Sequence, residues 1–109
     1  MLHFLTVGHL DEAAVREARL LVLRPLDPQT VTRLLAQYRD EKDSAEPSFE
    51  KHRVVIDKGV VRCPWYTPRL NRTAVQFSLA LAEATGCQIA DIEHGRVLAR
   101  ADLQSLTTR

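Results

Sequence analysis

The chain has 109 residues, of which 45% are hydrophobic and 27% are charged, and its formal net charge is +1. These values are ordinary for a folded protein, so we expect one domain over residues 1–109 rather than a disordered or low-complexity chain. The nearly balanced charge gives no overall attraction to nucleic acid or to an anionic membrane, so any electrostatic binding has to come from a local cluster.

Two cysteines, Cys63 and Cys87, are too few for a disulfide framework, and each lies in an apolar run. Such residues are usually free buried thiols, and a bridge between these two is the less favoured alternative. The N-terminus lacks the basic start of a secretion signal, and no run approaches the ~18 apolar residues of a membrane helix. We therefore expect a cytoplasmic protein that has no membrane partner.

The first predicted element is a strand over residues 3–7, where large apolar residues precede Gly8. Residues 11–18 are polar and rich in alanine, which is typical of a loop or a short helical turn. The apolar run of residues 19–23 stops at Pro25 and predicts a strand that is buried on both faces. A continuous helix over residues 11–23 is the competing interpretation.

Asp27 and Pro28 predict the start of a helix, because aspartate is a favoured N-cap and proline a favoured first residue. Apolar residues then recur at helical spacing, which predicts an amphipathic helix to about residue 42: Val31, Leu34, Leu35 and Tyr38. Residues 40–51 carry five acids and two lysines, and we expect them to form a loop.

Residues 53–63 predict a β-hairpin with a two-residue turn at Lys58 and Gly59. The face that we expect to join the core holds Val54, Ile56, Val61 and Cys63. The opposite face holds Arg53, Val55, Val60 and Arg62. A three-residue turn over residues 57–59 would shift this register, because the length of a turn fixes the pairing of its strands.

The most strongly patterned stretch is residues 71–85, where apolar residues cover most of a predicted helix. Asn71 is a suitable N-cap, and Gly86 is suited to the left-handed conformation that ends many helices. We expect this helix to be buried on most of its circumference and to form the centre of the fold.

Residues 88–92 and 96–100 predict a second hairpin around His94 and Gly95. In this register the side chains expected to face the helix are Ala90, Ile92, Val97 and Ala99. The side chains expected to face outward are Asp91, Glu93 and Arg96, with a cross-strand pair between Glu93 and Arg96.

From residue 20 onward the predicted order is strand, helix, strand, strand, helix, strand, which is the order of ferredoxin-like folds. We therefore expect an α+β fold with two layers: an antiparallel sheet carrying two main helices on one face, preceded by an extra N-terminal strand. This architecture hosts many unrelated functions, so it predicts no activity by itself.

A basic and aromatic stretch precedes the central helix, and no acid occurs between Asp57 and Glu83. Helix N-termini favour negative charge, so the arginines here predict a negative group nearby. One hypothesis is a site for a phosphate, a nucleotide or, less favoured, a nucleic acid, formed by Arg62, Trp65, Tyr66, Arg69 and Arg72. The favoured interpretation is that residues 40–51 or a partner subunit supply the negative charge.

The second candidate site contains Asp91, Glu93 and His94, residue types that suit a metal ion or acid–base catalysis. His94 has no second histidine at ligand spacing, however, and the pairing of Glu93 with Arg96 is a sufficient structural role for Glu93. A nucleophilic Cys63 would need a nearby histidine. With only four glycines and no glycine-rich phosphate loop, we expect neither a metal nor a cofactor.

The function that we favour is a non-catalytic protein-interaction module, either a homodimer or bound to a partner protein. An open antiparallel sheet leaves one face and two edges free, and pairing with another chain covers them. The residues expected at this interface are Val55, Val60 and Leu98, which fall on the predicted face away from the helices. The alternatives are the anion-binding or nucleic-acid module and a small enzyme that uses Asp91, Glu93 and His94.

Overall fold

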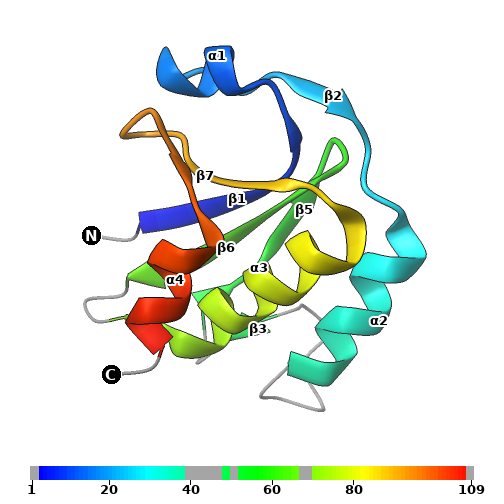
Figure 1. The fold of residues 1–109 in the computed structure, drawn as a ribbon. Helices are drawn as coiled ribbons and strands as arrows, with labels where there is room; N and C mark the ends of the chain where they lie inside the picture. The colour runs from blue at the N-terminus through cyan, green and yellow to red at the C-terminus, as the bar shows by residue number, and fades with distance from the viewer. Residues whose placement is uncertain (1–2, 39–47, 50–51, 67–69, 108–109) are drawn as a thin grey trace.

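The computed structural model describes residues 3–38, 48–49, 52–66 and 70–107 (Figure 1). This part of the chain is an α+β fold with a six-stranded antiparallel sheet, a separate two-stranded sheet and four helices. The strands are β1 (His3–Leu10), β2 (Val22–Arg24), β3 (Ser48–Phe49), β4 (His52–Arg53), β5 (Val55–Asp57), β6 (Val60–Tyr66), β7 (Gln88–Asp91) and β8 (Arg96–Leu98). The helices are α1 (Glu12–Arg16), α2 (Pro28–Tyr38), α3 (Arg72–Thr85) and α4 (Arg100–Thr107).

The N-terminal strand β1 is the centre of the sheet, whose order is β5-β6-β1-β7-β8, with β2 pairing the end of β1. The expectation that this strand is an addition to the sheet is therefore wrong. Its residues meet the requirements of a central strand because they are buried on both sides. On the face that carries the main helices, Leu5 and Val7 are fully buried. On the opposite face, Gly8 lies so close to Val60 that a Cβ atom at position 8 would be 2.6 Å from the valine Cγ1 atom.

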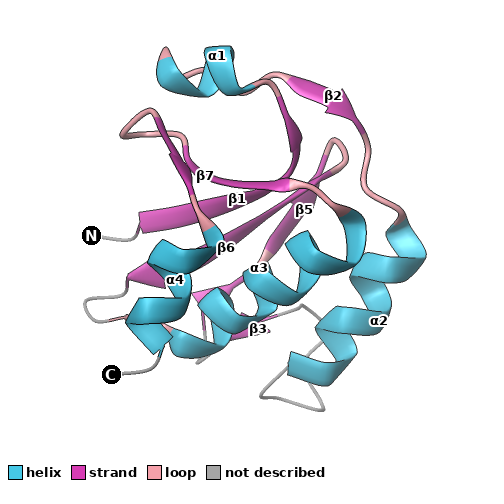
Figure 2. Cartoon of the chain, viewed as in Figure 1, coloured by secondary structure: helices cyan, strands magenta, loops and turns pink. Residues whose placement is uncertain are grey.

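Helices α2, α3 and α4 cover one face of the sheet (Figure 2). The prediction of a buried helix over residues 71–85 is confirmed, since α3 buries Phe77 and Leu81 completely. The Asn71 side chain accepts a hydrogen bond from the Ala74 N–H (3.1 Å), and Gly86 ends the helix with a φ of 70°. These two residues set the length of the helix, as their chemistry predicts.

Helix α2 begins where the sequence predicts. An Asp27 carboxylate oxygen accepts a hydrogen bond from the Thr30 hydroxyl (2.8 Å), and this bond lowers the pKa of Asp27. Within the described residues the helix ends at Tyr38, whose ring lies edge-on to Phe77 with centroids 6.0 Å apart. The predicted end of the helix near residue 42 and most of the predicted loop at 40–51 lie outside the described residues. Ser48–Phe49 and His52–Arg53, which belong partly to that stretch, form the β3–β4 pair.

The opposite face of the sheet also carries a helix, so the expected two-layer description is incomplete. Helix α1 starts at an N-cap, Asp11, which accepts a hydrogen bond from the Ala13 N–H (2.9 Å). Its residue Val15 joins a second, smaller apolar cluster with Leu10, Val60 and Ala90. The ambiguous stretch 11–23 is therefore a short helix followed by a connection to β2, rather than one continuous helix.

In the two predicted hairpins, the observed strand pairing can be compared with the pairing expected from the turn residues. Lys58 and Gly59 form the predicted two-residue turn with φ values of 52° and 80°, and Ile56 lies opposite Val61 as expected. The second hairpin differs, because residues 92–95 form a four-residue connection and Asp91, not Glu93, lies opposite Arg96.

The predicted faces of this second hairpin are also wrong, because the face assigned to the main helices packs against α1 instead. Ile89 and Leu98 face the helices, whereas Ala90 and Val97 belong to the cluster under α1. No helix in the described part of the chain combines the length and the apolar character needed to cross a bilayer.

Candidate functional site

The described members of the predicted anion site do not converge. Arg62 projects from the face opposite α3, and its guanidinium carbon lies 5.1 Å from the centroid of the Phe4 ring. Trp65 is 9% exposed and packs in the core below the helices, whereas Arg72 is exposed in the first turn of α3. Arg69 and the side chain of Tyr66 lie outside the described residues. Anion binding by this set therefore stays a prediction.

The second predicted site is partly assembled. The Asp91 carboxylate lies 2.7 Å from the His94 Nδ1 atom and also accepts a hydrogen bond from the His94 backbone N–H at 3.3 Å. The His3 ring, which sequence reasoning did not include, lies 5.9 Å from that of His94 between centroids. Glu93 is exposed in the connection between β7 and β8.

The contact of the Asp91 carboxylate with Nδ1 fixes the orientation of the His94 ring, as a general base would require. The same contacts also close the β7–β8 connection, which is a structural role. Among the described residues, no group of three or more His, Cys, Asp and Glu side chains is placed to hold a metal ion. Catalysis at Asp91, Glu93 and His94 stays a prediction.

Both cysteines are free thiols held in environments that suppress ionisation. Burial raises the pKa of Cys63 to about 12, against a weaker opposing effect of a hydrogen bond with Ser78. Burial also raises the pKa of Cys87, which is less enclosed. A thiol nucleophile acts as the thiolate, so neither environment activates sulfur for catalysis.

We therefore expect a thiol-specific alkylating reagent at pH 8 to modify Cys87 before Cys63 in the native protein. Cys63 should react only as fast as the protein unfolds, because its thiol is buried and protonated. Mass spectrometry of digested samples taken over time measures both rates. Modification of native Cys63 at the rate of Cys87 would contradict this, and would return Cys63 to the candidate nucleophiles.

The three residues predicted for the interface do not share an exposed surface. Val60 is 2% exposed beneath α1, and Leu98 is 9% exposed on the side of the helices. Val55 is half-buried on the opposite face, next to Arg62. Leu98 lies inside because the face of the second hairpin predicted to point outward packs on the main helices. Val60 is covered by α1, a segment for which the sequence predicts a loop or a short helical turn.

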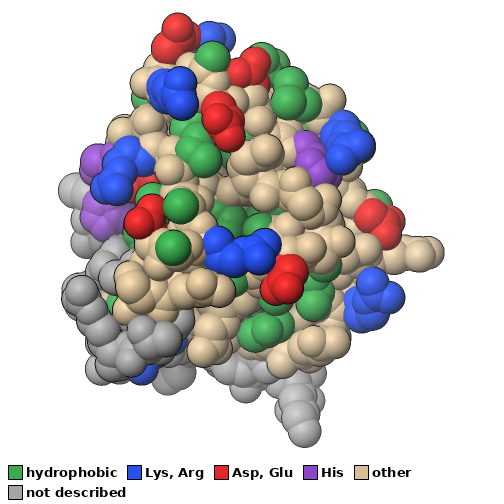
Figure 3. Space-filling view, in the orientation of Figure 1, with side chains coloured by type: hydrophobic (Ala, Val, Ile, Leu, Met, Phe, Trp, Pro, Cys, Tyr) green, Lys and Arg blue, Asp and Glu red, His purple; other side chains and the backbone are tan. Residues whose placement is uncertain are grey.

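The large apolar side chains that are exposed lie elsewhere. In the described residues they are Leu20 (43% exposed), Leu21 (46%), Leu23 (64%) and Ile56 (51%), which we name the apolar strip. Hydrophobic side chains do reach the surface at the end of the molecule that holds α1 and β2 (Figure 3). The sequence pattern misses the strip because a continuous apolar run predicts a buried strand, and here that strand is peripheral.

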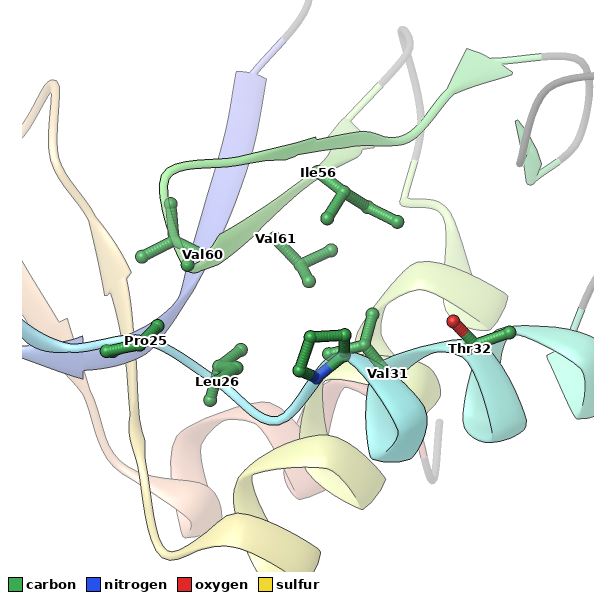
Figure 4. Close-up of a pocket in the computed structure, with 9 residues that line it drawn as sticks. Pro25, Leu26, Val31, Thr32, Ile56, Val60 and Val61 are labelled. Atoms are coloured by element: carbon green, nitrogen blue, oxygen red, sulfur yellow. The ribbon is translucent and has the colours of Figure 1, made fainter.

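A hollow of about 230 Å³ lies between the β5–β6 hairpin and the start of α2. Ile56 and Val61 approach it from the hairpin, and Val31 and Thr32 approach it from α2 (Figure 4). Its lining is apolar except for Thr32: Pro25, Leu26, Pro28, Val31, Thr32, Ile56, Gly59, Val60 and Val61. Ile56 belongs to both the hollow and the apolar strip, and Pro25, which lines the hollow, follows Leu23 by two residues in the sequence.

The connection from β2 to α2 is tied to the hairpin beside this hollow. The Leu26 N–H donates a hydrogen bond to the Gly59 carbonyl oxygen at 3.0 Å. At the end of β2, Arg24 lies opposite His9 of β1, and partial burial together with the charge of Arg24 lowers the pKa of His9. The apolar strip therefore ends in a locally positive region.

Comparison of the chain with models of protein families, with curated proteins and with solved structures found no match in any of the three. The geometry of the described residues is accordingly the basis for a functional proposal.

Proposed function

We propose that this chain is a small, non-catalytic protein-interaction module that binds its partner through the apolar strip and the adjoining hollow. The observation that carries the proposal is the exposure of Leu20, Leu21 and Leu23 on one short segment, together with the exposure of Ile56 on an edge strand. Burying a leucine at an interface contributes about 1.5–3 kcal/mol, which favours covering such a surface with another protein.

The proposal includes a homodimer, in which the partner is a second copy of this chain. Strand β5 is an edge of the sheet, and Ile56 projects from it with half of its surface exposed. Edge strands present unpaired backbone groups that pair readily with another chain, and a second copy is the simplest such chain.

We also infer that the sheet has the ferredoxin-like order, with β1 in place of the strand first expected at residues 19–23. The order β5-β6-β1-β7, with β1 antiparallel to β6 and β7, supports this inference. In it α2 and α3 are the two helices of the unit, and α1 with β2 is an insertion between β1 and α2.

The alternatives from the sequence have weaker support. An anion site needs its arginines together, but Arg62 and the helix carrying Arg72 lie on opposite sides of the sheet. An enzyme at Asp91 and His94 has an oriented imidazole, but Glu93, the third residue of that hypothesis, is exposed in the β7–β8 connection. A thiol nucleophile is disfavoured because burial raises the pKa of both cysteines.

The proposal is tested by placing a photo-crosslinking residue at position 23 and, as a control, at the exposed position 101 of α4. We expect one specific protein product, a second copy or another protein, from position 23 and none from position 101. The crosslinked protein, purified separately, should bind Leu23→Ser at least about tenfold more weakly than wild type, because a buried leucine is lost. Ala101→Ser should bind as wild type does. Equal binding by wild type and Leu23→Ser would overturn the proposal.

A further inference from the structure

Strand β2 has one open edge within the described part of the chain. It pairs with the end of β1 through Leu10 opposite Val22 and His9 opposite Arg24, and no other described strand pairs with it. An open edge offers backbone N–H and C=O groups to an incoming strand, and pairing of this kind is a common way of binding extended peptides.

The side chains of β2 define what such a strand would meet. Leu23 of β2 is exposed, as are Leu20 and Leu21, which directly precede the strand. Alternate residues of an extended segment laid along this edge would cover them on both faces. An irregular loop or a helix would cover the leucines without pairing the open backbone groups.

The charge at this edge is positive, which narrows the choice of occupant. Arg24 is exposed and makes no ion pair with any described residue, and its charge contributes to lowering the pKa of His9. Arg19 is already paired with Glu17. Within the described residues, the unpaired positive charge of this segment is thus at Arg24, where an incoming carboxylate would gain a charge-assisted hydrogen bond.

A second copy of β2 fits this edge less well. Residues 18–26 contain two arginines and no acid, so another copy of β2 would bring no carboxylate of its own strand to Arg24. Anionic lipid would neutralise Arg24 but would leave the backbone edge unpaired. We therefore propose that the partner, in the protein-interaction function proposed above, docks as an extended, acidic segment that pairs with β2 and places a carboxylate at Arg24.

Amide NMR titration with synthetic peptides tests this. The probe is a blocked peptide of about eight residues with alternating valine and threonine and two glutamates. Its matched forms carry lysine for glutamate, or N-methyl groups on alternate amides that prevent strand pairing. We expect the glutamate peptide to shift the amides of residues 20–24, and the lysine peptide to bind roughly fivefold more weakly.

Two variants separate the effect of the charge at Arg24 from the effect of reversing any exposed positive charge on the protein. Arg24→Glu should reverse the preference, so that the lysine peptide binds more tightly than the glutamate peptide. Arg96→Glu changes another exposed edge arginine, on β8, and should leave the preference unchanged. The N-methylated peptide should lose at least about tenfold in affinity, because the strand hydrogen bonds are blocked.

Several results would overturn the inference. These are equal affinity for the two charged peptides, equal binding of the N-methylated form, shifts away from residues 20–24, or no binding of the glutamate peptide at about 1 mM. Self-association through residues 20–24, or Arg24-dependent binding to phosphatidylserine vesicles, would also overturn it. A crosslinked protein partner at position 23 would still support the interaction function if the peptides failed, so the two failures are distinguishable.

Discussion

Replacing Phe77 by alanine is expected to lower the free energy of unfolding by about 4 kcal/mol, because truncating a buried phenylalanine removes its packing and leaves a cavity. Phe77 is fully buried in the middle of α3, and it is among the largest fully buried side chains in the described residues. It also contacts the Tyr38 ring of α2, so its loss loosens the packing between the two helices as well as the contact with the sheet. Urea denaturation followed by circular dichroism measures the effect.

The matched control for this change is Gln76→Ala, which alters the neighbouring, exposed position of the same helix. Alanine has a high helix propensity, so this variant should stay within about 0.5 kcal/mol of wild type. Both variants should keep the wild-type dependence on urea concentration if each unfolds in two states. A loss for Phe77→Ala no larger than that of the control would mean that α3 is not the centre of the core.

The sequence predicts α3 and the β5–β6 hairpin well because their determinants are local. Asn71 and Gly86 act through their own backbone and the first or last turn of the helix, so no distant contact is needed to place them. Lys58 and Gly59 fix the register of their hairpin in the same way.

The roles of the first two strands depend on contacts that are distant in the sequence. No pattern within residues 3–10 predicts that position 8 must lack a side chain. The reason is Val60, more than fifty positions later, which occupies the space where a Cβ atom would be. Residues 19–23 have the apolar composition of a buried strand, yet only Val22 turns towards a cluster while its leucine neighbours are exposed. Local pattern alone could not decide which of the two strands is central.

The candidate surfaces were harder to predict than the fold. The four-residue connection after Asp91 shifts the pairing of the second hairpin by two residues, which keeps Ala90 and Val97 on one shared face. The prediction failed because it assigned that face to the main helices, whereas it packs against α1. Leu98 lies in the core because its face, not that of Val97, packs on the main helices, and the longer connection brings His94 onto the Asp91 carboxylate. The apolar strip had no signal of its own, because exposure is a property of the packed chain and not of an apolar run.

Substituting alanine for Gly59 is expected to cost about 3 kcal/mol, from two effects acting at one position. The φ of 80° is unfavourable for any residue with a Cβ, which costs about 1–2 kcal/mol. In addition, a Cβ at this position would lie 2.6 Å from the Pro25 Cα atom, and backbone cannot yield as a flexible side chain does. The hydrogen bond from Leu26 to the Gly59 carbonyl would be strained as the two segments separate.

Gly86→Ala is the control that separates these two effects. Gly86 has a similar φ of 70°, but nothing lies within 4 Å of a Cβ built there, so this variant should lose only about 1–2 kcal/mol. The additional loss at Gly59 therefore measures how firmly the β2–α2 connection is held against the hairpin. Equal losses in thermal or urea denaturation would show that this contact is loose. Since Pro25 and Gly59 both line the hollow, a loose contact would also remove the fixed shape on which binding at the hollow depends.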